Sequence, residues 1–164
     1  KRQSLFELVE GGFSFGDGAT FFGAGPPGPQ QPLGFPQHKG IYQWNPDTGY
    51  SVVVDTATIV PNASGETFSV EAKNSLSADS YTVDGTDIYF RGAGSIDSFI
   101  SRIGIYRWRD GDIVAVVDTE MTVDGKAIAD VQIGRTSAAD GRIAFHVLFE
   151  DGSSGIFVAH PAAE

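Results

Sequence analysis

The sequence predicts an all-β protein, and three observations support this class. Glycine is abundant, with 21 residues in a chain of 164, and aromatic residues make up 12% of it. Valine and isoleucine occur in short runs, and no long stretch is rich in alanine, leucine, glutamate and lysine. Turn-forming Asp-Gly and Asn-Pro pairs separate these runs. Together these features are typical of many short strands joined by turns, and the length suits one domain over residues 1–164.

One long segment of the sequence occurs almost twice. GIYQWNPDTGYSVVVDT at 40–56 returns as GIYRWRDGDIVAVVDT at 104–119, and a partial third version reads ADGRIAFHVLF at 139–149 and GIFVAH at 155–160. The shared unit is an Asp-Gly pair, an aromatic strand, a variable insert, a Gly-Ile-aromatic triplet and a Val-rich strand that ends in Asp-Thr. We therefore predict three repeats, at about residues 5–60, 68–124 and 128–160, a period typical of propellers and related arrays.

Each complete repeat is expected to hold four strands. The turn chemistry of NPDTG at 45–49 and RDG at 109–111 joins the third strand to the fourth as a hairpin. The Asp-Thr pairs at 55–56 and 118–119 are expected to cap the strand ends through their side chains. The predicted strands are 5–10, 19–23, 41–44 and 50–55 in the first repeat, 68–72, 87–91, 105–108 and 113–118 in the second, and 128–133, 142–149 and 156–160 in the third.

The fourth strands, YSVVVD and DIVAVVD, do not alternate apolar with polar residues. A nearly continuous apolar run predicts a strand buried on both faces. A sheet packed between two neighbouring sheets would have such strands, as in the blades of a propeller. Propeller-like four-stranded units are therefore the first interpretation of the fold, and a three-fold β-prism or β-trefoil is the alternative.

The variable insert differs in every repeat. In the first repeat, residues 24–40 hold five prolines, which exclude a helix and favour extended segments. This insert is either a solvent-exposed loop or an arm that docks on a partner, in which case the contacts come from Pro26, Pro27, Pro29, Pro32, Phe35 and Pro36. In the second repeat, residues 95–104 place Ile96, Phe99, Ile100 and Ile103 at helical spacing, so a short amphipathic helix is expected there.

The repeat resembles a known family. Gly141, Ala144 and Phe145, followed by Gly155-Ile156-Phe157, match the motif of secreted bacterial tandem-repeat proteins with an Asn-x-x-Gly-x-x-Ala-Phe repeat. Ala138 stands at the asparagine position and departs from the motif. The resemblance implies a propeller-like fold and a secreted or cell-surface location, and it implies no catalytic residues.

Two patterns raise the question of a chemical site. Ser14 lies in GFSFG, the pattern of a hydrolase nucleophile, and His146 and His160 follow it in the chain. The pattern needs a turn from a strand into a helix, and Ser14 lies between predicted strands, so a hydrolase ranks third among the functions considered. Trp44 and Trp108 could form a sugar-stacking platform, but their repetition at one strand position favours packing between sheets.

Charge and composition narrow the possible partners. The formal net charge of −10 disfavours nucleic acid, and no apolar run is long enough for membrane insertion. Asp110, Asp112, Asn45 and Asp47 suit turns better than a calcium loop, and the three histidines show no ligand spacing, so no metal or cofactor is expected. Asn62 begins a glycosylation sequon, which matters only in a host that reads it.

The third repeat lacks its fourth strand, so residues 156–160 are expected to present an open edge. Open edges recruit strands, and Ile156, Phe157 and Val158 would then make the contact. Residues 1–10 of the same chain could cover the edge, or a neighbouring copy could supply its residues 1–10 or its proline-rich insert. We therefore predict a non-enzymatic, secreted or cell-surface structural module that forms a homo-oligomer or filament through this edge or the proline-rich insert. A carbohydrate-binding module is the alternative from another class.

Overall fold

The protein is all-β. The computed structural model describes residues 13–15, 20–24, 38–45, 49–70, 72, 75–76, 80–97 and 99–160, with side chains from 38 onward except at 44, 45 and 50. These residues form fourteen strands in antiparallel sheets, and none of the described residues is helical. The strand predicted at 5–10 and most of the proline-rich insert lie outside the described residues.

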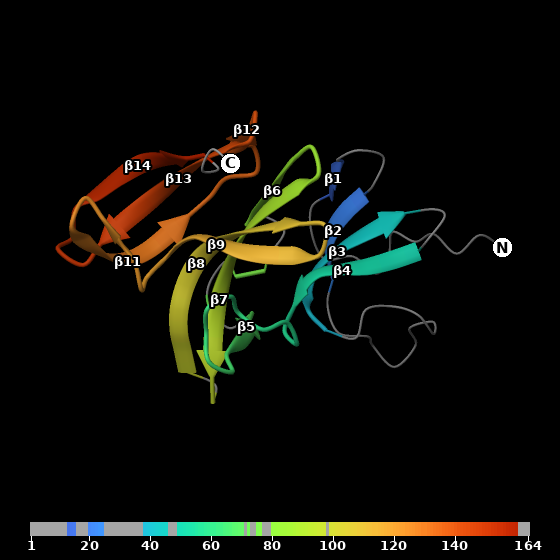
Figure 1. Cartoon of the computed structure of the whole chain (residues 1–164), viewed down its shortest axis with the longest axis horizontal. Coiled ribbons are helices and arrows are strands. Elements are labelled where there is room, and N and C mark those ends of the chain that lie inside the picture. The colour runs from blue at the N-terminus through green and yellow to red at the C-terminus, as the bar shows by residue number, and fades with distance from the viewer. Residues whose placement is uncertain are drawn as a thin grey trace.

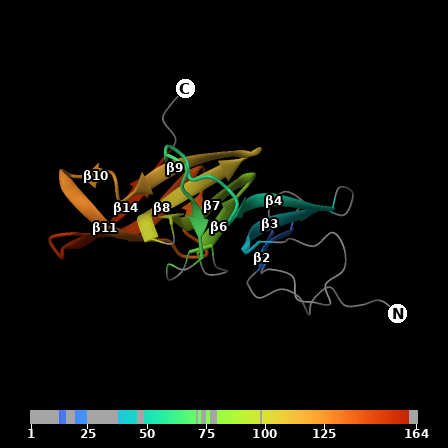
Figure 2. The same ribbon diagram turned by 90° about the horizontal axis from the view of Figure 1, so that it is seen from below.

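Three sheets follow one another along the chain. Figures 1 and 2 show the second sheet lying between the first and the third. The first sheet has the order β1 (Phe13–Phe15), β2 (Thr20–Ala24), β3 (Gly40–Asn45) and β4 (Gly49–Asp55). In the second, β5 (Thr67–Ser69) and β6 (Tyr81–Asp84) both pair with β7 (Asp87–Ile96), which is followed by β8 (Phe99–Arg109) and β9 (Asp112–Asp118). In the third, β10 (Thr122–Val123) pairs with β11 (Lys126–Gln132), while β11, β12 (Ala138–Ala139) and β14 (Ser154–Ala159) all pair with β13 (Arg142–Phe149).

The second sheet is covered on both faces because alternate residues of a strand point to opposite sides. On β8, Tyr106 belongs to a first core that also contains Ile41 and Val54 of the first sheet. The next residue back, Ile105, belongs to a second core together with Phe145 and other residues of the third sheet. Two separate cores therefore join three sheets, and the Gly-Ile-aromatic triplet contributes to both of them.

The Val-rich strands correct one expectation from the sequence. The prediction that they are buried on both faces is wrong, because Val52 and Val114 are exposed. Each strand contains a β-bulge at the equivalent position. In β4 the bulge is at Val53, because Ile41 pairs with Val54 and Tyr42 pairs with Val52. In β9 it is at Val116, because Ile105 pairs with Val117 and Tyr106 pairs with Ala115. The extra residue lets adjacent valines lie on the core side, which is why the apolar run is continuous.

The expected helix at 95–104 is also wrong. These residues end β7 and begin β8, and the two strands stay paired to the tip, where Ile96 faces Phe99. The turn contains Asp97, whose φ of 51° is a left-handed conformation that aspartate tolerates. Three of the four apolar residues at helical spacing, Ile96, Phe99 and Ile100, are exposed, and Ile103 alone of the four packs against the second core. Pairing with a neighbouring strand satisfies the backbone more fully here than one isolated helical turn could.

Two local predictions are confirmed. Asp110 and Gly111 both have positive φ and form the hairpin turn between β8 and β9. The aspartates that end the Val-rich strands cap them as expected: Asp55 Oδ1 accepts the N–H of Ala57 at 2.9 Å, and Asp118 Oδ1 accepts the N–H of Glu120 at 2.9 Å. The same side-chain chemistry therefore turns the chain at the end of both strands.

Buried tyrosines should make the protein sensitive to alkali. Burial raises the pKa of Tyr81 to about 12, and burial near Asp55 and Asp118 raises the pKa values of Tyr42 and Tyr106 well above 10. The folded state keeps these protons after the unfolded chain has lost them. Their stabilising contribution is therefore complete below pH 10 and is lost as the pH rises through the folded pKa values. We expect the urea midpoint to fall steadily above pH 10 and these phenols to stay un-ionised at 295 nm until unfolding. Ionisation of all tyrosines near pH 10 in the folded protein would contradict this.

Candidate functional site

The open edge of the third sheet is the first candidate site. The ladders of the second and third sheets correspond: Phe90 pairs with Tyr106 in one, and Phe145 pairs with Phe157 in the other. β8 has a further neighbour, β9, on its other side. In the part of the chain that the structure describes, β14 pairs with β13 alone, which leaves the edge predicted at 156–160 open.

β14 is better suited to recruit a strand than the other sheet edges at β4 and β9. Its six residues, SGIFVA, carry no charge, and its ladder with β13 contains no register shift. β4 and β9 end in aspartate, and both contain a bulge. Charges and bulges are the usual means by which sheet edges avoid pairing with other chains, and β14 has neither.

An exposed, mainly apolar surface lies next to this edge. On the side of the third sheet turned away from the second sheet, β14 places Ile156 and Val158, which are 71% and 59% exposed. β13 adds the exposed Leu148 and the half-buried Ala144 and His146. We call these five residues the outer face. A shallow hollow of about 340 Å³ lies partly on it, between His146, Ile156 and Gln132 of β11.

The three edge residues named from the sequence divide between two sides. Ile156 and Val158 lie on the outer face, but Phe157 points inward and packs against the second core. Its ring centroid lies 6.3 Å from that of Phe145 and 6.0 Å from that of Phe149. Phe157 can therefore contribute to the edge only through its backbone. The residues Ala144, His146 and Leu148 were not singled out from the sequence, although their alternation with buried residues along β13 is a signal that could have found them.

The alternative sugar-binding residues lie elsewhere. Trp108 is half-buried and packs against the first core, on the side of β8 that faces the first sheet. This packing favours the structural interpretation of Trp108 over a stacking platform. The side chain of Trp44 and the proline-rich residues 25–37 lie outside the described residues.

The hydrolase pattern does not form its expected geometry. Ser14 lies within β1, paired with Phe21 of β2, and not at a turn from a strand into a helix. His146 and His160 belong to the third sheet and the residue after it. Among the described residues, no group of three or more His, Asp or Glu side chains is placed to hold a metal ion.

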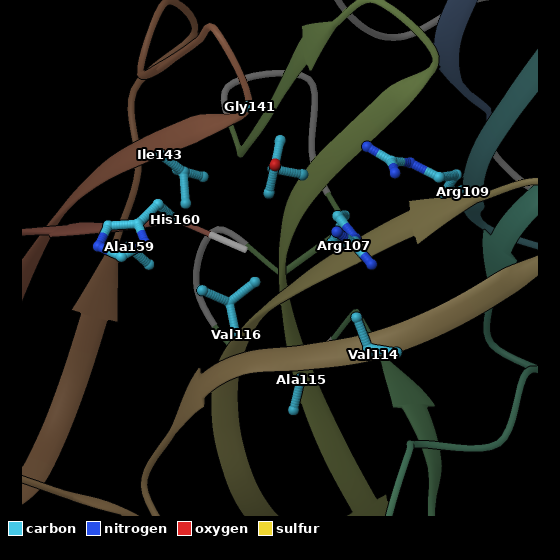
Figure 3. A pocket seen from close by; sticks show the side chains of 10 residues that line it. Arg107, Arg109, Val114, Ala115, Val116, Gly141, Ile143, Ala159 and His160 are labelled. Atoms are coloured by element: carbon cyan, nitrogen blue, oxygen red, sulfur yellow. The ribbon is translucent and has the colours of Figure 1, made fainter. Parts of the chain in front are cut away.

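A second hollow, of about 620 Å³, lies between β8 and β9 of the second sheet and β13 and β14 of the third (Figure 3). Arg109 lines it and forms a two-point ion pair with the buried carboxylate of Asp87, with Nη2 2.5 Å from Oδ2. The hydroxyl of Tyr89 lies 3.4 Å from the same oxygen, and burial raises the pKa of that phenol. Arg107 projects between Val116 and Arg109 in Figure 3. The guanidinium of Arg109 is thus held within the second sheet, because Asp87 and Tyr89 both belong to β7.

Comparison with known proteins gives no family for this chain. Neither a family model, nor a curated protein, nor a solved structure matches it. Within the described residues, no helix is long and apolar enough to cross a membrane. The candidate site must therefore be interpreted from its own geometry.

Proposed function

We propose that this protein is a non-enzymatic structural module that associates with copies of itself through the open edge at β14. The observation that carries the proposal is the position of that edge. β14 stands where β3 and β8 stand in the other sheets, each of which pairs with a Val-rich strand on its far side. Within the described part of the chain, the side of β14 away from β13 has no partner strand, and its N–H and C=O groups are a template for a strand supplied by a neighbour.

The arrangement of the sheets supports a repeating assembly. A propeller-like stack grows by adding one sheet after another, and three sheets rarely close a ring. A strand donated by the next copy is a head-to-tail contact, which builds a ring if the rotation closes and a filament if it does not. A secreted or cell-surface location belongs to the proposal and rests on the family resemblance of the repeat motif.

The test is sedimentation velocity over a wide range of protein concentration, at low and moderate salt. A net charge of −10 repels like copies, so we expect association to strengthen as salt screens this repulsion. Hydrogen exchange measured on the same samples should show slower exchange in Ser154–Ala159 as the concentration rises, because new edge hydrogen bonds protect its amides. The strand Asp112–Asp118 serves as the internal control and should not change. A chain that stays monomeric at every concentration and salt would overturn the proposal.

A further inference from the structure

The chain uses the same pair of faces at both of its internal interfaces. The isoleucine of each Gly-Ile-aromatic triplet faces the following sheet: Ile41 lies in the first core, and Ile105 lies in the second. The aromatic residue after it faces the preceding sheet, since Tyr106 lies in the first core and Phe157 packs against the second. This rule follows from the alternation of side chains along a strand, applied to sheets stacked in one direction.

The outer face is the isoleucine side of a sheet that has no following sheet in the part of the chain described. His146 pairs with Ile156 in the third sheet as Arg91 pairs with Ile105 in the second. Beneath the third sheet Ile105 is 0% exposed and Arg91 is buried, whereas Ile156 is 71% exposed. The five residues of the outer face include no acidic side chain, and Asp130, which pairs with Leu148, has its carboxylate 2.8 Å from the guanidinium of Arg91.

The matching surface is the aromatic side of the first sheet, which has no preceding sheet among the residues that the structure describes. Val52 of β4 pairs with Tyr42 of β3, as Ala115 of β9 pairs with Tyr106 of β8. Ala115 and Tyr106 contribute to the first core, where they meet the first sheet, but Val52 is 50% exposed. Tyr42 on the same side is 2% exposed, so the exposed apolar residue there is Val52. Among the described residues, one end of the stack therefore presents the isoleucine side of the third sheet and the other end presents Val52 on the aromatic side of the first sheet.

We infer that the outer face of the third sheet binds the first sheet of a second copy at Val52, stacked in the same direction as the two contacts that the chain makes within itself. This inference rests on the proposed self-association and specifies its partner surface. The edge contact at β14 and this face contact lie at the same end of the stack, so one neighbouring copy can make both.

Cysteine cross-linking tests the contact directly, because the chain has no cysteine of its own. Ile156→Cys in one preparation and Val52→Cys in another are mixed under oxidising conditions. We expect a disulfide-linked dimer to form in the mixture much faster than in either preparation alone. A mixture of Ile156→Cys with Val114→Cys gives the background rate, since Val114 is exposed on the second sheet. Equally fast cross-linking of Ile156→Cys with itself, or a mixture no faster than background, would overturn the inference.

A charge substitution gives an independent measurement. Ile156→Asp would place a carboxylate in the buried contact, so the dissociation constant of self-association should rise about tenfold or more. The fold should be unaffected because Ile156 is exposed in the single chain. Ile59→Asp is the matched control, since Ile59 is 64% exposed and lies outside the outer face. If copies associate normally in Ile156→Asp, the face contact is wrong while the proposed function stands; if wild type never associates, both are wrong.

Discussion

Replacing Tyr106 with alanine is expected to lower the free energy of unfolding by about 3–5 kcal/mol, the usual cost of removing a buried aromatic ring. Tyr106 is fully buried in the first core. Its ring centroid lies 4.9 Å from that of Phe68, edge to face, and 5.7 Å from that of Phe90. The ring also fills space above Gly104, where a Cβ atom would lie 2.9 Å from the tyrosine hydroxyl. The loss should appear in urea unfolding followed by tryptophan fluorescence.

Two milder variants separate the ring from its hydroxyl. The Tyr106 hydroxyl is buried and finds no hydrogen-bond partner among the described residues, so Tyr106→Phe should leave stability unchanged or raise it slightly. The equivalent Tyr42 donates a hydrogen bond to the carbonyl of His38 at 2.7 Å, so Tyr42→Phe should cost about 1 kcal/mol. A Tyr106→Ala protein as stable as wild type, or a larger loss for Tyr106→Phe than for Tyr42→Phe, would contradict this account of the core.

The longer strands were largely predictable from the sequence, but the short strands β1, β6, β10 and β12 were not. The second and third sheets therefore have five strands each, where four and three were predicted. The Gly-Ile-aromatic triplets and the Val-rich runs fall in β3, β4, β8 and β9, because turn residues bound each run and the repeats agree with one another. Their burial was not predictable. A bulge at Val53 or Val116 adds one residue to the strand and places two adjacent valines on the same side. The resulting continuous valine run has the same sequence pattern as a strand that is buried on both faces. Only the register within the hairpin distinguishes the two cases, and a run of similar valines does not specify that register.

The error at 95–104 has a similar origin. Ile96, Phe99 and Ile100 have helical spacing, but the exposed tip of a hairpin can contain apolar residues at the same spacing. Part of the candidate site was visible in the sequence, since a missing fourth strand after GIFVAH predicts an open edge. The outer face could not be predicted from the sequence. To assign Ile156 to the outer side and Phe157 to the inner side, one must know which side of the third sheet is covered by the second sheet.

The second large effect is expected at Asp118. Its carboxylate is 3% exposed and lies 3.3 Å from Nη1 of Arg102, while its other oxygen accepts the N–H of Glu120 at 2.9 Å. Asp118→Ala removes the cap and leaves the mostly buried guanidinium with Glu66 alone, at 3.5 Å. Breaking one side of a buried ion pair costs about 3–5 kcal/mol, and the remaining partner Glu66 places the expected loss near the lower limit, about 3 kcal/mol. Urea unfolding at neutral pH measures it.

Asparagine at the same position separates the two roles of Asp118. Asp118→Asn keeps an oxygen that can accept the N–H of Glu120 but loses the charge that faces Arg102, so its loss of stability should be clearly smaller than that of alanine. Asp112→Ala, at the exposed start of the same strand, is the matched control and should change stability by no more than about 0.5 kcal/mol. Combining Asp118→Asn with Arg102→Met completes a double-mutant cycle, in which the double variant should lose less than the sum of the two single losses because the two side chains interact. Additive losses in this cycle would show that the ion pair contributes nothing and that the cap alone stabilises the end of β9.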